Sequence, residues 1–309
     1  MRSPALALVL LLALGAAPAC SIKRMAVRSL ADTLAEGGDV FASDDDPELV
    51  RDAIPFALKT YESLLEDLPK HDGLLLATCQ GFTQYAYAFV QTDADMLDPV
   101  EFDRITQMHD RAVKLYLRGR DYCLRALEVR HPGVERRLRD NPLSAIPQAK
   151  PADVPFLYWT GASWGAAVSL GLDRPALVAD LPAVRALMAA ALALDEDYSR
   201  GAIHEAMISL EAIPEIMGGS PTRARMHFER AVELSEGKTP GPYVTLAASV
   251  SVAEQNRAEF VRLLEQALAV DPNGEPSWRL ASLITQKRAR HLLDRVDDLI
   301  VEDIPEDPD

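Results

Sequence analysis

Apolar residues recur every three or four positions through almost the whole chain, and this spacing limits the fold more than any other feature. The first clear stretch comprises Ile54, Ala57, Leu58, Tyr61, Leu65 and Leu68. It follows a cluster of acidic residues and a proline at 43–47 and stops at Pro69, as expected for an amphipathic helix. No succession of Val- and Ile-rich strands alternates with such stretches. The sequence therefore predicts an all-α fold.

The same spacing predicts a second helix from about residue 71 and a longer one that starts at Asp98-Pro99. The face expected to be buried in the longer helix includes Phe102, Ile105, Ala112 and Tyr116, and Gly119 is a candidate break. Closely spaced prolines between residues 131 and 155 disfavour helix there. We expect this Pro-rich segment to connect two helical halves, held down by Leu143, Ile146 and Val154.

The C-terminal half contains a weak internal repeat. Residues 188–209 align with residues 228–249 at an offset of 40, which pairs Gly201 with Gly241, and a further offset of 36 reaches Pro276. Each unit is a helix, a turn rich in Gly and Pro, and a second helix. Such periods are typical of tetratricopeptide-like antiparallel helix pairs that stack on one another. We predict one all-helical domain over 47–301, followed by an acidic tail over 302–309.

The N-terminus has the features of an export signal over residues 1–19. Arg2 precedes the apolar run 5–14, and Ala17-Pro18-Ala19 forms a cleavage site of small residues. Two interpretations of the next residue, Cys20, stay open: an ordinary cut before a cysteine, or a bacterial lipobox with Cys20 lipidated. The lipobox is favoured, and residues 20–46 would then link a membrane anchor to the helical domain.

The two remaining cysteines, Cys79 and Cys123, and the overall charge bear on compartment and partners. Export permits a disulfide between the two cysteines, but both lie in amphipathic helical patterns, so two buried free thiols are favoured. The formal net charge is −15. Such a surface repels the phosphates of nucleic acids, and we predict no nucleic-acid partner.

The stretch Gly161-Ala162-Ser163-Trp164-Gly165 matches G-x-S-x-G, the nucleophile elbow of α/β-hydrolases. That elbow needs a strand before the serine and a parallel sheet around it, and the sequence predicts neither. In a helix, Gly161 and Gly165 instead share one face that lets a second helix approach. Similarly, His204-Glu205 begins like the zinc motif H-E-x-x-H, but Ile208 stands where the second histidine is required. We predict no catalytic residue, no metal, no cofactor and no enzymatic activity.

Two aromatic clusters are candidates for ligand binding. They comprise Tyr158, Trp159 and Trp164 in the glycine-rich segment, and Phe82 and Tyr85 in the second helix. Each ring either fills the core or lines a cavity between helices, where an amphipathic aromatic side chain can hold a ligand.

Taken together, three segments resemble the TatT family, the tetratricopeptide lipoprotein component of tripartite ATP-independent periplasmic (TRAP) transporters. They are residues 25–69 with Cys20 before them, residues 155–165, and the repeat end 267–272. The resemblance covers essentially the whole mature chain. Alanine at position 17, where lipoproteins usually have leucine, departs from the common lipobox.

This resemblance implies a non-catalytic, all-helical scaffold. Ser21, next to Cys20, resembles the sorting residue that sends Gram-negative lipoproteins to the outer membrane, so we expect the scaffold on the periplasmic face of that membrane. The resemblance also implies a homotrimer that binds a periplasmic TRAP substrate-binding protein and holds a small hydrophobic ligand. The alternative is a structural lipoprotein that binds a protein partner in the cell envelope without any ligand. For localisation, the alternative is a soluble periplasmic protein.

Overall fold

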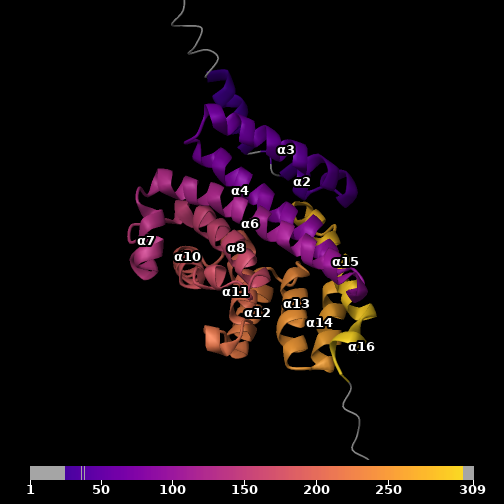
Figure 1. Cartoon of the computed structure of the whole chain (residues 1–309). Coiled ribbons are helices and arrows are strands. Elements are labelled where there is room, and N and C mark those ends of the chain that lie inside the picture. The colour runs from indigo at the N-terminus through magenta and orange to yellow at the C-terminus, as the bar shows by residue number, and fades with distance from the viewer. Residues whose placement is uncertain (1–24, 36, 38, 302–309) are drawn as a thin grey trace, which may run out of the picture.

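The computed structural model describes residues 25–35, 37 and 39–301, and the regular secondary structure of these residues is entirely helical. The prediction of an all-α fold is confirmed (Figure 1). The expected signal peptide, the candidate lipidation residue Cys20 and the acidic tail 302–309 lie outside the described residues.

The N-terminal half contains three long helices. A short helix, α2 (Asp39–Ala42), precedes α3 (Pro47–Asp67), whose first turn is capped by Asp46: its Oδ1 accepts hydrogen bonds from the backbone N–H groups of Glu48 and Leu49. The second long helix, α4 (Asp72–Ala86), continues through a π-helical segment, η1 (Tyr87–Gln91), into α5 (Thr92–Asp95). A 3₁₀ turn, η2 (Pro99–Glu101), leads into α6 (Phe102–Arg130).

The long helix α6 is unbroken at Gly119, so the candidate break there was wrong. A Cβ atom on Gly119 would lie 2.9 Å from Thr83 Oγ1 and 3.1 Å from the carbonyl oxygen of Cys79. The glycine therefore permits close packing of α6 on α4. Phe102, which we expected on the buried face, is 70% exposed because it stands in the first turn, beyond the end of the packed face.

A disulfide joins Cys79 of α4 to Cys123 of α6, with the two Cα atoms 5.4 Å apart. The favoured interpretation, two buried free thiols, was therefore wrong. Both cysteines are fully buried, as the helical pattern indicated. The pattern placed each cysteine on an inner face but carried no information on which other helix that face would meet.

The Pro-rich connection holds one short helix, α7 (Val134–Asp140), and two 3₁₀ turns, η3 (Pro142–Ser144) and η4 (Pro151–Asp153). Val154 is fully buried and Ile146 packs against the core, as expected. Leu143 is 92% exposed and does not hold the segment down. That role falls to Asp153, whose carboxylate accepts hydrogen bonds from Arg130 Nε at 2.7 Å and from the backbone N–H of Lys150 at 2.9 Å.

The C-terminal half is a further run of helices. They are α8 (Val154–Leu170), α9 (Pro175–Val178), α10 (Leu181–Leu194), η5 (Tyr198–Arg200), α11 (Ala202–Glu211), η6 (Glu215–Met217), α12 (Pro221–Leu234), α13 (Gly241–Leu246), η7 (Ala247–Ser251), α14 (Arg257–Ala269), η8 (Pro276–Trp278), α15 (Arg279–Asp294) and α16 (Val296–Leu299). Within the described residues, Pro175–Leu194 is long and apolar enough to cross a membrane. Its larger part, α10, packs against α8 as a core helix, which accounts for the same composition.

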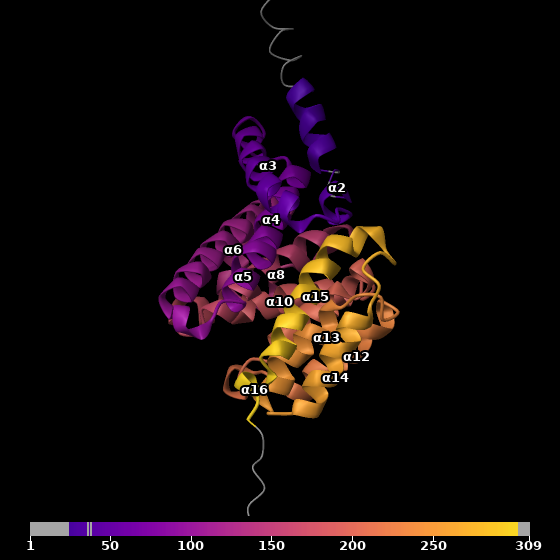
Figure 2. The same cartoon turned by 90° about the vertical axis from the view of Figure 1, so that its right-hand side faces the viewer.

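Long helices pack largely on their neighbours in chain order, from α3 on α4 to α14 on α15. The last long helix, α15, then returns to contact α2 and α3, so that the C-terminal half closes back on the N-terminal helices (Figures 1 and 2). Arg279 Nη1 donates a hydrogen bond to the carbonyl oxygen of Ser43 at this closure, over 3.2 Å.

The internal repeat stays a prediction. Its paired glycines have different roles: Gly201 has a positive φ of 94° in the turn before α11, whereas Gly241 begins α13 without one.

Candidate functional site

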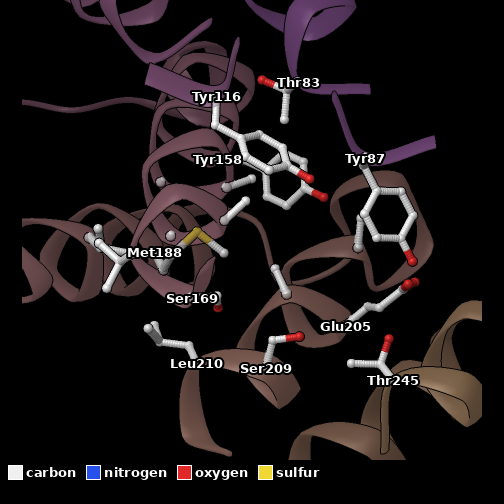
Figure 3. A pocket seen from close by; sticks show the side chains of 18 of the residues that line it. Thr83, Tyr87, Tyr116, Tyr158, Ser169, Met188, Glu205, Ser209, Leu210 and Thr245 are labelled. Carbon is white, nitrogen blue, oxygen red and sulfur yellow. The ribbon is translucent and has the colours of Figure 1, made fainter. Parts of the chain in front are cut away.

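A cavity of about 380 Å³ lies between the two helical halves. Helices α4, α6 and α8 contribute to one part of its wall, and α10, α11, α13 and α15 contribute to the rest. Figure 3 shows side chains from these distant parts of the sequence converging on one space. The volume is within the range of cavities that hold small organic ligands.

The G-x-S-x-G stretch lies within α8 and forms part of this wall. A Cβ atom on Gly161 would lie 2.6 Å from Met188 Sδ, and one on Gly165 would lie 3.3 Å from Val184 Cγ1. Both glycines therefore let α10 approach α8 closely. Ser163 is fully buried, and its Oγ donates to the carbonyl oxygens of Trp159 and Thr160 in its own helix. The segment has no strand before the serine and is not an elbow.

Two of the five aromatic candidates, Tyr158 and Trp159, line the cavity. Their rings meet edge to face with centroids 5.1 Å apart, and the Tyr158 ring also contacts Tyr198 at 5.3 Å. Burial, followed by the negative charge of Glu205, raises the pKa of Tyr158 far above its ordinary value. Its hydroxyl therefore remains a protonated donor that faces the cavity.

The other three candidates lie outside the cavity lining. Trp164 is 5% exposed, and its Nε1–H donates to Asp180 Oδ2 at 2.9 Å, so it is a core residue. Phe82 is also buried and stacks on Tyr122 with ring centroids 5.9 Å apart. Tyr85 packs against Phe89 instead.

Two π-helical segments border the cavity, and the sequence did not predict either. Tyr87 and Gln91 of η1 line it on one side, and Ala248 and Ser249 of η7 line it on another. A π-turn inserts one extra residue into a helix and often occurs at functional sites. Apolar periodicity cannot reveal such a turn, because a one-residue shift lies within the tolerance of the pattern.

The cavity is polar on one side and apolar on the other. In Figure 3, Met188 and Leu210 lie on one side of the view, and Tyr87, Glu205 and Thr245 lie on the other. Leu181, Val184 and Ile213 extend the apolar wall. An amphipathic molecule matches this arrangement.

The polar side contains one cation and one anion. Arg288 of α15 lies with Nη2 3.5 Å from Asp95 Oδ2, and its Nη1 donates to the hydroxyl of Tyr87 at 3.4 Å. Glu205 of α11 is partly exposed, and burial raises the pKa of its carboxyl to about 7. Sequence reasoning considered Glu205 only as part of a failed zinc motif and passed over Arg288.

The neighbour of Glu205, His204, faces a different group. Its Nδ1 lies 2.8 Å from His227 Nδ1, and burial lowers the pKa of both imidazoles. Across the part of the chain that the structure describes, no cluster of three or more His, Cys, Asp or Glu side chains is arranged to hold a metal ion.

Fold and cavity together define an all-helical protein, built of helices packed largely in chain order, with a cavity between its two halves. The sequence model of the family described as "TRAP transporter T-component" matches residues 43–300, and the chain belongs to this family. The resemblance to TatT proteins is confirmed.

A protein of Treponema pallidum (strain Nichols), described as an uncharacterized protein, is similar over nearly its whole length. It is 34% identical over 302 residues, covering 92% of this chain and 94% of the relative.

Family membership makes the chain a component of a TRAP-type transport system. It gives the protein an envelope location and an association with that system. The family is one of transporter components and not of enzymes.

Proposed function

We propose that this protein is a periplasmic scaffold of a TRAP-type system that holds a small amphipathic ligand in the cavity between its halves. The observation that carries the proposal is the cavity itself, which is lined by helices from both halves and by Tyr158 and Trp159. This space of about 380 Å³ opens to solvent, so a ligand can enter it, and it is large enough to hold a small organic molecule.

The proposal includes attachment to the periplasmic face of the outer membrane through lipidated Cys20. The Cys79–Cys123 disulfide supports export, because disulfides persist mainly in oxidising compartments. A soluble periplasmic protein is the alternative for an ordinary cleavage before Cys20.

The proposal also includes two protein contacts: a periplasmic TRAP substrate-binding protein, and two further copies of this chain in a homotrimer. Both come from the resemblance to TatT proteins. The outer face of α3 supports such contacts, since Leu49 and Phe56, seven positions and two turns apart, are 59% and 79% exposed.

A pull-down from envelope extract tests the transport role. The tagged, full-length lipoprotein should recover a substrate-binding protein of the TRAP type, identified by mass spectrometry, and size measurement of the purified protein should give three copies. An unrelated outer-membrane lipoprotein with the same tag is the control. If no such binding protein is recovered, the scaffold role fails.

Native mass spectrometry of the purified protein tests the ligand role. A bound molecule should add a defined mass that is released on unfolding. Recovery of the protein partner together with a ligand-free protein would instead support the alternative, a structural lipoprotein without a small-molecule role.

A further inference from the structure

Glu205 presents a carboxylate to the cavity without a protein partner. Within residues 25–35, 37 and 39–301, no cation and no hydrogen-bond donor contacts its side-chain oxygens. Glu211, on the same helix, is different: Arg185 Nη1 lies 2.8 Å from its Oε1, and Arg223 Nη2 lies 2.6 Å from its Oε2. Helix α11 therefore pairs one acid completely and leaves the other open to the cavity.

Gly241 makes room for this carboxylate. A Cβ atom at position 241 would lie 2.1 Å from Glu205 Oε1 and 2.5 Å from its Cδ, closer than any real contact allows. The backbone of Gly241 has no positive φ, so its conformation does not require glycine. Glycine at position 241 therefore provides space, and the Glu205 carboxylate occupies that space.

Among the charged side chains that line the cavity, Glu205 has no oppositely charged neighbour in the described part of the chain. Arg288, the cation there, lies beside Asp95, whose carboxylate oxygen is 3.5 Å from Nη2. An ionised carboxylate removed from water is unfavourable unless a positive group or several donors approach it. A cationic ligand supplies the positive charge that no described residue lining the cavity gives to Glu205.

The wall of the cavity opposite Glu205 is apolar and can contact an alkyl chain. Leu181, Val184 and Met188 of α10 and Leu210 of α11 line it, and none of them offers a polar side-chain group other than the weakly polar thioether of Met188. The hydroxyl of Tyr158 also makes no hydrogen bond to a described residue, and it can accept a hydrogen bond from an ammonium group beside Glu205.

Resting on the ligand-holding role proposed above, we propose that the cavity binds an aliphatic amine, with its ammonium group on the Glu205 carboxylate and its alkyl chain against α10 and α11. The amine stays protonated near neutral pH, as a lysine side chain does. Binding therefore pairs opposite charges in a cavity that is partly shielded from water. The attraction between the two charges is stronger there than at the protein surface.

Calorimetric titration with three probes of equal length tests this proposal: n-octylamine, n-octanol and octanoate. At about pH 8, where both the carboxylate and the ammonium are charged, octylamine should bind the full-length protein at least about tenfold more tightly than octanol. Octanoate should bind most weakly, because its charge repels Glu205. Burial raises the pKa of the Glu205 carboxyl to about 7, so lowering the pH to about 5 should protonate it and remove the preference for the amine.

Few other groups complicate the pH dependence. The titratable or charged residues that line the cavity with Glu205 are Tyr87, Tyr116, Tyr158 and Arg288. Phenol hydroxyls and guanidinium groups keep their charge state between about pH 5 and pH 8. The histidine pair outside the lining, His204 of α11 and His227 of α12, is assessed separately with His227→Gln, which should keep the preference for octylamine.

Two variants should remove the preference in different ways. Glu205→Gln keeps the shape and loses the charge, so octylamine and octanol should then bind equally. Gly241→Ala keeps the carboxylate but displaces it, and should also weaken octylamine binding. Glu229→Gln, an exposed carboxylate on α12 outside the lining, is the matched control and should bind like wild type.

The outcomes separate this inference from the ligand role on which it rests. If octanol or octanoate binds as tightly as octylamine, or if Glu205→Gln keeps the preference, the amine assignment is overturned and the ligand role stands. If none of the three probes binds and native mass spectrometry finds no retained molecule, the ligand role itself fails.

Discussion

Met188 of α10 lies directly against Gly161 of α8, with its Sδ 2.6 Å from the position that a Cβ on Gly161 would occupy. This contact explains the glycine of a motif that resembles a hydrolase signature. Both helices contribute to the cavity wall, and the distance between them sets where Tyr158 and Trp159 stand.

Gly161→Val should therefore destabilise the protein. Overpacking a close helix contact typically lowers the free energy of unfolding by about 1–3 kcal/mol. Urea denaturation followed by circular dichroism measures the change. Ala189→Val, at an exposed position on α10, is the control for a β-branched residue in a helix and should cost less. Wild-type stability in Gly161→Val would mean that α10 readily moves away from α8.

Loss of the Cys79–Cys123 disulfide should destabilise the protein more strongly. The bridge spans a sequence separation of 44 residues. Restricting a loop of that length in the unfolded chain is worth about 4 kcal/mol in the chain-entropy treatment. The Cys79→Ala/Cys123→Ala double variant should lose about this much in urea denaturation. A reductant should lower the stability of wild type and leave the double variant unchanged; equal effects on both would contradict a bonded pair.

Glu205→Gln should stabilise the ligand-free protein at high pH. The folded-state pKa, about 7, is above the ordinary value of 4.5. The folded state therefore binds the proton more tightly, and the Glu205 contribution to the free energy of unfolding falls as pH rises from about 4.5 to 7. The variant escapes this loss, so it should gain as much as about 3 kcal/mol at pH 8 and nothing near pH 4.

Thermal denaturation of wild type and Glu205→Gln across this pH range measures that difference. Glu229→Gln, whose carboxylate is exposed, should follow wild type at every pH. A stability difference between wild type and Glu205→Gln that is the same at both ends of the range would show that burial does not perturb Glu205.

Ligand binding should change the fluorescence of Trp159 but not that of Trp164, the other tryptophan of α8. Trp159 lines the cavity, whereas Trp164 is buried and bonded to Asp180. Adding octylamine or the native ligand should shift the emission of wild type and of Trp164→Phe. Trp159→Phe should show no shift. Loss of the signal in Trp164→Phe instead would mean that the ligand sits elsewhere.

Cys20→Ala should abolish attachment to the outer membrane. Metabolic labelling with a radioactive fatty acid should mark the wild-type protein and not the variant, and the variant should fractionate with the periplasm. Because a single small residue is changed in a segment before the helices, circular dichroism of both proteins should match. A wild-type protein that incorporates no label would support the soluble alternative.

The sequence by itself determined the all-helical fold and pointed to the family. Apolar spacing is a local property: each helix must bury its own stripe, so the stripe is visible in any stretch such as 54–68. Helix starts were equally local, as at Asp46, where a carboxylate caps its own helix. Gly161 and Gly165 likewise predicted that a second helix would approach the glycine face of their segment, although they did not identify that helix as α10.

Only the tertiary structure decided what each inner face meets. Trp159 and Trp164 have the same surroundings in sequence, yet one lines the cavity and the other fills the core, because the cavity forms where helices of both halves fail to meet. The disulfide and the unpaired Glu205 carboxylate were hidden for the same reason. Each depends on a residue from a distant helix: Cys79 bonds to Cys123, and Gly241 leaves the space that the Glu205 carboxylate occupies. Helical periodicity specifies the direction in which a side chain points but not which residue lies next to it.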